Sequence, residues 1–113
     1  MIREEKLLVI LAEEASEVVQ EISLLSQQIS KCLRFGPNQV YQKIGLSNAQ
    51  RVVNCIPKLM LELNDFKALV EMLQSEGTLP SFEGSMDWDP DMIEAKKNKV
   101  ESYLKEDEAV WQL

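Results

Sequence analysis

The chain of 113 residues has no histidine, only two cysteines and few aromatic residues. The lack of histidine excludes Ser/His and Cys/His nucleophilic catalysis, the usual zinc sites and the Glu-x-x-His ligand pairs of di-iron bundles. Cys32 and Cys55 form no Cys-x-x-Cys pair, which indicates a reduced, intracellular protein. The low aromatic content of 6% weakens the case for a base-stacking surface. Oxygen-ligand chemistry with hard metal ions survives these exclusions.

A basic excess and long apolar runs are also missing. The formal net charge of -7 leaves no surplus of cations to neutralise nucleic acid phosphates, so we expect no nucleic acid partner. The apolar run Leu7 to Ala12 is short and ends in Glu13-Glu14, unlike a signal peptide or a membrane span. We therefore expect a cytoplasmic protein with no membrane partner.

Two long stretches show the apolar periodicity of helices. The first runs from about Glu4 to Phe35 without an internal Pro or Gly, and Gly36-Pro37-Asn38 ends it. Ser47 is a good N-cap for a second helix from Asn48 to about Ser75. Pro57 either kinks this second helix or opens a new one.

The rest of the chain completes an all-α domain. Residues 40–46 form a connector or a short helix, residues 78–90 form a loop, and a last amphipathic helix runs from about Pro90 to Trp111. We expect a single domain over residues 1–113, built as an antiparallel helical hairpin plus a C-terminal helix. Because one hairpin leaves its apolar stripes half covered, we expect dimerisation to complete a four-helix bundle, with a tetramer as the alternative.

Four carboxylates interrupt the apolar stripes of the two long helices, where negative charge is costly. At about 100° per residue, Glu14 and Glu17 fall among apolar residues of the first helix, and Glu62 and Asp65 do the same on the second. The arms are similar in length, so folding the hairpin brings both pairs to one height. Converging carboxylates repel one another unless a cation lies between them, which predicts a divalent metal site. Glu21 shares the stripe, and either joins this site or pairs with a Lys or Arg of another helix.

Several motifs together carry a family resemblance. They are Glu-Glu-x-x-Glu at residues 13–17, Ser-Lys-Cys-Leu-Arg-Phe-Gly at residues 30–36, Glu-x-x-Asp at residues 62–65, and the closing helix around residues 94–104. In this order and context the chain resembles the all-α nucleoside triphosphate pyrophosphohydrolases, the MazG-like superfamily.

The resemblance implies hydrolysis of a nucleoside triphosphate, expected to be a deoxynucleotide, to the monophosphate and pyrophosphate. It implies Mg²⁺ as cofactor, with Mn²⁺ as a substitute, held by Glu14, Glu17, Glu62 and Asp65. Glu17 and Glu13 are the expected catalytic residues, with Glu13 acting either as a further ligand or as the base that accepts a proton from water.

Four cations are the main candidates for substrate binding, and Asn48 and Arg51 are weaker ones. Lys31 and Arg34 lie three residues apart on one helix face, as do Lys96 and Lys99, and each pair is suited to phosphate oxygens. The first pair is equally explained by the dipole at a helix C-terminus, and the second by a solvated helix face. The competing function is a non-enzymatic helical dimer that binds protein partners and carries a degenerate metal site.

Overall fold

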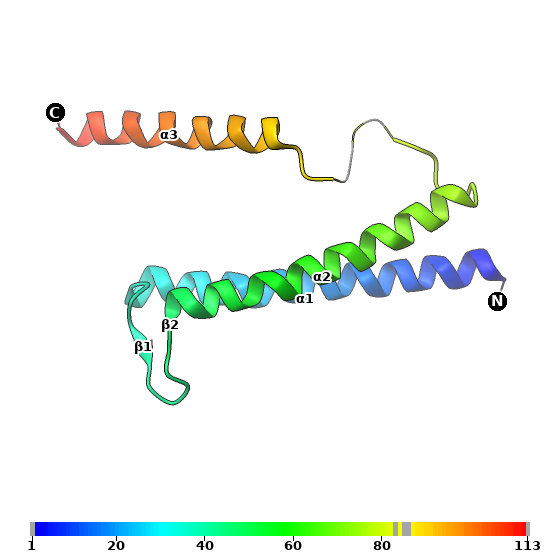
Figure 1. Ribbon diagram of the computed structural model, residues 1–113, viewed down its shortest axis with the longest axis horizontal. Coiled ribbons are helices and arrows are strands. Elements are labelled where there is room, and N and C mark those ends of the chain that lie inside the picture. Colours follow the sequence, from blue (N-terminus) through cyan, green and yellow to red (C-terminus); the bar gives the residue numbers. More distant parts are fainter. Residues whose placement is uncertain (1, 83, 85–86, 113) are drawn as a thin grey trace. The chain divides into compact units, whose positions relative to one another are not determined.

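The computed structural model describes residues 2–82, 84 and 87–112, with side chains described as far as Asp107. The chain forms two units, Met1–Ser81 and Phe82–Leu113. The first unit is a helical hairpin, and the second contains one helix (Figure 1). The prediction that residues 1–113 form a single domain stays a prediction.

Three helices make up almost all the regular structure of the described residues: α1 (Arg3–Phe35), α2 (Asn48–Ser75) and α3 (Pro90–Gln112). The expected all-α class is confirmed, and the helices begin and end within two residues of the predicted bounds. Helix α2 runs through Pro57 without a break, so the proline lies inside one helix rather than at the start of a new one. No described helix has an apolar stretch long enough to cross a membrane.

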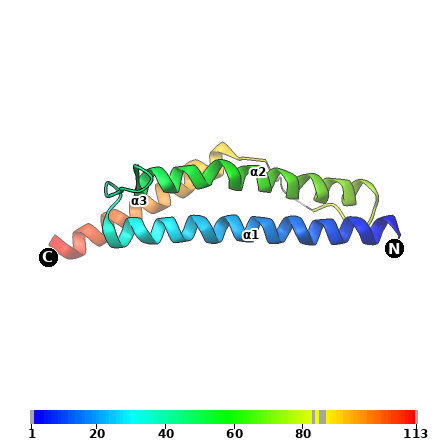
Figure 2. The ribbon, with the colours of Figure 1, turned by 90° about the horizontal axis from the view of Figure 1, so that it is seen from below.

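Helices α1 and α2 pack antiparallel along their lengths (Figure 2). Their contact line, which we call the seam, follows the steps of three and four that keep one face of a helix toward its partner. In α1 the seam contains buried or half-buried Leu7, Leu11, Glu14, Val18, Glu21, Leu25, Gln28 and Cys32. In α2 it contains Asn48, Val52, Cys55, Leu59, Glu62, Phe66, Leu69 and Leu73. Glu14, Glu21 and Gln28 follow one another at intervals of seven residues, so they form a polar row within the α1 seam.

The tip of the hairpin is a short β-ribbon, where the sequence left a connector and a short helix as alternatives. Strands β1 (Val40–Tyr41) and β2 (Leu46–Ser47) pair antiparallel, with Val40 opposite Ser47. Gly45, at a φ of 68°, donates its N–H to the carbonyl of Tyr41 at 2.9 Å and closes the ribbon. Two short strands cannot be recognised from alternation in so few residues.

Hydrogen bonds join the tip to the start of α2. The Ser47 hydroxyl accepts the N–H of Gln50 at 3.1 Å, and the Gln50 side chain accepts the N–H of Ser47 at 2.8 Å, a capping box. Asn48 is buried, and its amide nitrogen donates to the carbonyl of Gly36 at 2.9 Å. The end of α1 is thereby fixed to the beginning of α2.

Two ion pairs mark the register of the seam. Arg3 pairs with Glu76 at 2.7 Å at the open end, and Lys58 pairs with Glu21 at 3.2 Å. Fourteen residues separate Arg3 from Glu17, and fourteen separate Glu62 from Glu76, so the same register sets Glu17 opposite Glu62. The expectation that both acidic pairs reach one height is confirmed by the cluster described below.

We predict that Ser47→Ala destabilises the hairpin by about 1 kcal/mol, because it removes the side-chain oxygen that caps the first turn of α2. Urea unfolding followed by circular dichroism measures the loss. The control is Ser23→Ala, an exposed position inside α1 where alanine is the better helix former. Equal stability of Ser47→Ala and the parent chain would show that the cap is dispensable.

Candidate metal centre

Three of the four predicted ligands meet on the hairpin. Glu14 and Glu17 lie one turn apart on α1, and Glu62 faces them from α2. Each offers one carboxylate oxygen, and these three oxygens lie within 4.8 Å of one another. We call Glu14, Glu17 and Glu62 the acid cluster.

The acid cluster lies partly inside the seam. Glu14 and Glu62 are half-buried, whereas Glu17 is exposed at the edge. One oxygen of Glu14 and one of Glu62 are shielded from solvent and have no hydrogen-bond partner among the described residues. A shielded carboxylate oxygen without a donor is costly, so the geometry leaves both oxygens in need of a cation or a proton.

The carboxylates raise one another's pKa. Loss of solvent raises the pKa of Glu14 first, followed by the negative charges of Glu17 and Asp65, a hydrogen bond with Glu17 and the charge of Glu13. A hydrogen bond with Glu17 is the largest cause raising the pKa of Glu62, ahead of its loss of solvent. Glu17 is thus the group that couples the acids of the two helices.

Asp65 and Glu13 lie at the margin of the acid cluster. Asp65 is exposed and is not one of the three residues whose oxygens converge, yet its charge raises the pKa of both Glu14 and Glu62. Glu13 is exposed, and its charge raises the pKa of Glu14. Their assignments as a ligand and a catalytic residue stay predictions.

Glu21 takes the second of its two predicted roles. It is the most buried acidic side chain described, at 7% exposure, and its carboxylate pairs with Lys58 of α2. Lys58 was not predicted as this partner, although the common register of the two helices identifies it as the residue opposite Glu21. The ion pair next to the acid cluster therefore has a structural role.

The predicted phosphate ligands on α1 lie well away from the acid cluster. Lys31 follows Glu17 by fourteen residues, a distance of about 21 Å along the helix axis. Arg34 is one turn further on, with its guanidinium 5.2 Å from the centre of the Phe35 ring. Within one hairpin the backbone thus sets both cations far from the three carboxylates.

Lys96 and Lys99 lie on α3, in the second unit. Lys96 lines a hollow of about 630 Å³ that Trp88, Met92 and Ile93 also line, while Lys99 is exposed. Their role as substrate ligands stays a prediction.

The acid cluster suits a hard divalent cation. Carboxylate oxygens are the ligands that Mg²⁺ and Mn²⁺ prefer, and the described chain offers no histidine and no converging cysteine there. Glu14 on one helix and Glu62 on the other each also have one shielded oxygen without a donor among the described residues. The donor set and the missing hydrogen bonds both fit Mg²⁺.

No family model, curated protein or solved structure matches this chain.

We predict that protonation of Glu14 and Glu62 stabilises the metal-free protein increasingly as the pH falls toward about 4.5. The pKa values of Glu14 and Glu62 are raised above their ordinary value of 4.5, so their protonation favours the folded state. This contribution to the free energy of unfolding is complete below about pH 4.5, and it is lost as the pH rises through the raised pKa values of the folded state. Melting temperatures in EDTA between pH 5 and 7 measure it.

Glu17→Gln removes the charge that couples the cluster, so we expect it to flatten this pH dependence and not to lower the melting temperature at pH 7. Glu71→Gln is the matched control, because Glu71 is an exposed residue of α2 in a 3.9 Å surface pair with Lys67. A marked loss of stability in metal-free Glu17→Gln would show that the carboxylates do not repel one another.

Proposed function

We propose that the protein hydrolyses a nucleoside triphosphate to the monophosphate and pyrophosphate with Mg²⁺. The acid cluster carries the proposal, since three carboxylates from two helices converge and two of their oxygens lack donors. The resemblance of residues 13–17 and 62–65 to the MazG-like superfamily supports the choice of a nucleoside triphosphate. The net charge of -7 also requires a cation to bring a polyphosphate to this surface.

In this proposal water adds to the α-phosphorus, the bond from that phosphorus to the oxygen bridging to the β-phosphorus breaks, and pyrophosphate leaves. When bound, Mg²⁺ would supply positive charge that offsets the polyphosphate and lowers the pKa of water. Glu14, Glu17 and Glu62 would hold the ion, and Asp65, the fourth predicted ligand, would add negative charge at the edge. Glu13 accepts the proton from water, a role suited to an exposed carboxylate in a chain without histidine.

A dimer is part of the proposal, because one side of the hairpin is apolar and exposed. In both helices the residue one position after each seam residue lies about 100° from the seam. Since the helices are antiparallel, these positions fall on the same side of the hairpin. They include exposed Leu8, Val19, Ile22, Ile29, Leu33, Val53, Ile56 and Leu63. We call this set the apolar face.

The seam alone gives the hairpin little hydrophobic stabilisation. The buried apolar residues among those described are Leu7, Val70 and Leu73, and of these Leu73 alone is fully buried. Val19 remains 61% exposed and Ile22 47% exposed, as parts of a continuous surface rather than isolated side chains. A second hairpin on the apolar face would bury these residues in a four-helix bundle. Glu17 and Asp65 turn about 60° to the opposite side of the seam, so this dimer leaves the open side of the acid cluster free.

We predict that the purified protein releases pyrophosphate from at least one nucleoside triphosphate in the presence of Mg²⁺, and that Glu17→Gln lowers the rate by at least about 100-fold. A panel of ribo- and deoxynucleotides assayed for pyrophosphate measures this. Mg²⁺ should also raise the melting temperature of the parent chain and not that of Glu17→Gln.

Glu71→Gln serves again as the control and should keep both the activity and the stabilisation by Mg²⁺. Equal activity and Mg²⁺ response in Glu17→Gln and the parent chain would remove the acid cluster from the mechanism. Lack of turnover of every nucleotide by metal-loaded protein would favour a non-enzymatic helical dimer instead.

We predict that Ile22→Glu, on the apolar face, abolishes the dimer, because it would bury two charges in the bundle. Light scattering after gel filtration, with circular dichroism to follow folding, measures the result. Val9→Glu is the matched control, because Val9 is similarly exposed at 45% but points away from both the seam and the apolar face. A dimer that survives Ile22→Glu would place the interface elsewhere.

A further inference from the structure

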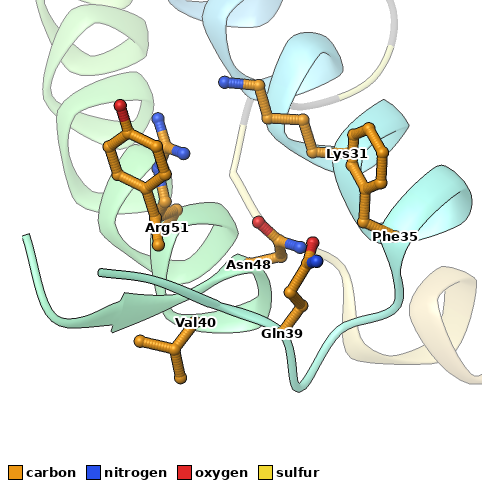
Figure 3. Close-up of a pocket in the computed structure, with 7 residues that line it drawn as sticks. Lys31, Phe35, Gln39, Val40, Asn48 and Arg51 are labelled. Carbon is orange, nitrogen blue, oxygen red and sulfur yellow. The ribbon is translucent and has the colours of Figure 1, made fainter. Parts of the chain in front are cut away.

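A hollow lies at the tip of the hairpin, away from the acid cluster. It has a volume of about 440 Å³, within the range of small-molecule sites. Its lining comes from the end of α1, the β-ribbon and the start of α2: Lys31, Phe35, Gln39, Val40, Tyr41, Asn48 and Arg51 (Figure 3). We call it the tip hollow.

The tip hollow is positively charged in a chain that is otherwise acidic. Lys31 reaches from α1 toward α2, where Arg51 lies (Figure 3). Neither cation forms an ion pair with a carboxylate of the described residues, and no acidic residue lines the hollow. The start of the 28-residue helix α2 lies beside them and adds the positive end of its dipole. Three sources of positive potential thus meet where no protein anion balances them.

The lining of the tip hollow contains aromatic and amide side chains besides its two cations. Phe35 and Tyr41 contribute aromatic rings, and the Arg51 guanidinium lies 5.3 Å from the centre of the Tyr41 ring. Asn48 is held by its bond to the Gly36 carbonyl, which fixes the direction of its amide oxygen. The hollow therefore combines two cations that can donate hydrogen bonds to an anion, two aromatic rings and a fixed hydrogen-bond acceptor.

The tip hollow is separate from the acid cluster along the hairpin. Arg51 precedes Glu62 by eleven residues, about 16 Å along α2, and Lys31 lies about 21 Å beyond Glu17. A phosphate group held by Lys31 and Arg51 is therefore not one held by a metal ion among the carboxylates.

We propose that the tip hollow is a binding site for a nucleoside monophosphate that needs no metal ion. Lys31 and Arg51 bind the phosphate, the rings of Phe35 and Tyr41 contact the base, and the Asn48 oxygen accepts a hydrogen bond from an amino or hydroxyl group. This site does not depend on the proposed hydrolysis, because its cations lie outside the acid cluster.

Titration of the protein with AMP in EDTA, followed by amide chemical shifts in NMR spectra, tests the proposal. EDTA removes Mg²⁺ and leaves the carboxylates to repel phosphate, so binding in EDTA reports the tip hollow. We expect the affinity for AMP to fall by at least about tenfold in Lys31→Gln and in Arg51→Gln, since each removes a charged donor. Arg51→Lys, which keeps the charge and loses the planar group, should lose less.

Two control variants separate the sites. Lys43→Gln removes an exposed cation of the same ribbon that does not line the hollow, and Glu17→Gln alters the acid cluster; both should bind AMP in EDTA like the parent chain. Unchanged affinity in Lys31→Gln and Arg51→Gln, or binding only with Mg²⁺, would overturn the proposal. Inorganic phosphate that binds as tightly as AMP would overturn the nucleoside assignment.

Discussion

The register of α1 against α2 is the constraint on which the rest of the structure depends. Three contacts fit one alignment of the two helices. They are the hydrogen bond between Asn48 and Gly36 at the tip, the Glu21–Lys58 ion pair, and the Arg3–Glu76 ion pair at the open end. That alignment forces acids of opposite helices together although they repel. The attractive contacts on either side of the acid cluster therefore support an arrangement that the carboxylates alone would not adopt.

Most of the fold followed from local signals. Gly36 and Ser47 mark helix ends by mechanisms that act within a few residues, so the bounds of α1 and α2 were predicted closely. The β-ribbon was not predicted, because its pairing depends on the two helix ends that it joins. At the site, the periodicity identified Glu14 and Glu62, but only the register showed that Glu17 couples them and that Asp65 lies at the margin.

The cations show where sequence reasoning reached its limit. Lys31 and Arg34 were paired because they are three residues apart, a spacing that describes one helix alone. The structure pairs Lys31 with Arg51 of the other helix across the tip hollow, and turns Arg34 onto the Phe35 ring. Partners on separate helices become visible only when the hairpin has closed, as with Glu21 and Lys58.

The polar row of the α1 seam restricts how a chain of this design can change length. A single-residue insertion in one arm would turn every following seam residue by about 100°, carrying Glu14 and Glu21 out of the seam of α1, or Glu62 out of the seam of α2. Insertions of seven residues, matched in both arms, would keep the face and the height of each acid. The hairpin can thus grow or shrink only in paired heptads, and the distance between its acid cluster and its tip is a quantity that evolution can adjust in such steps of about 10 Å.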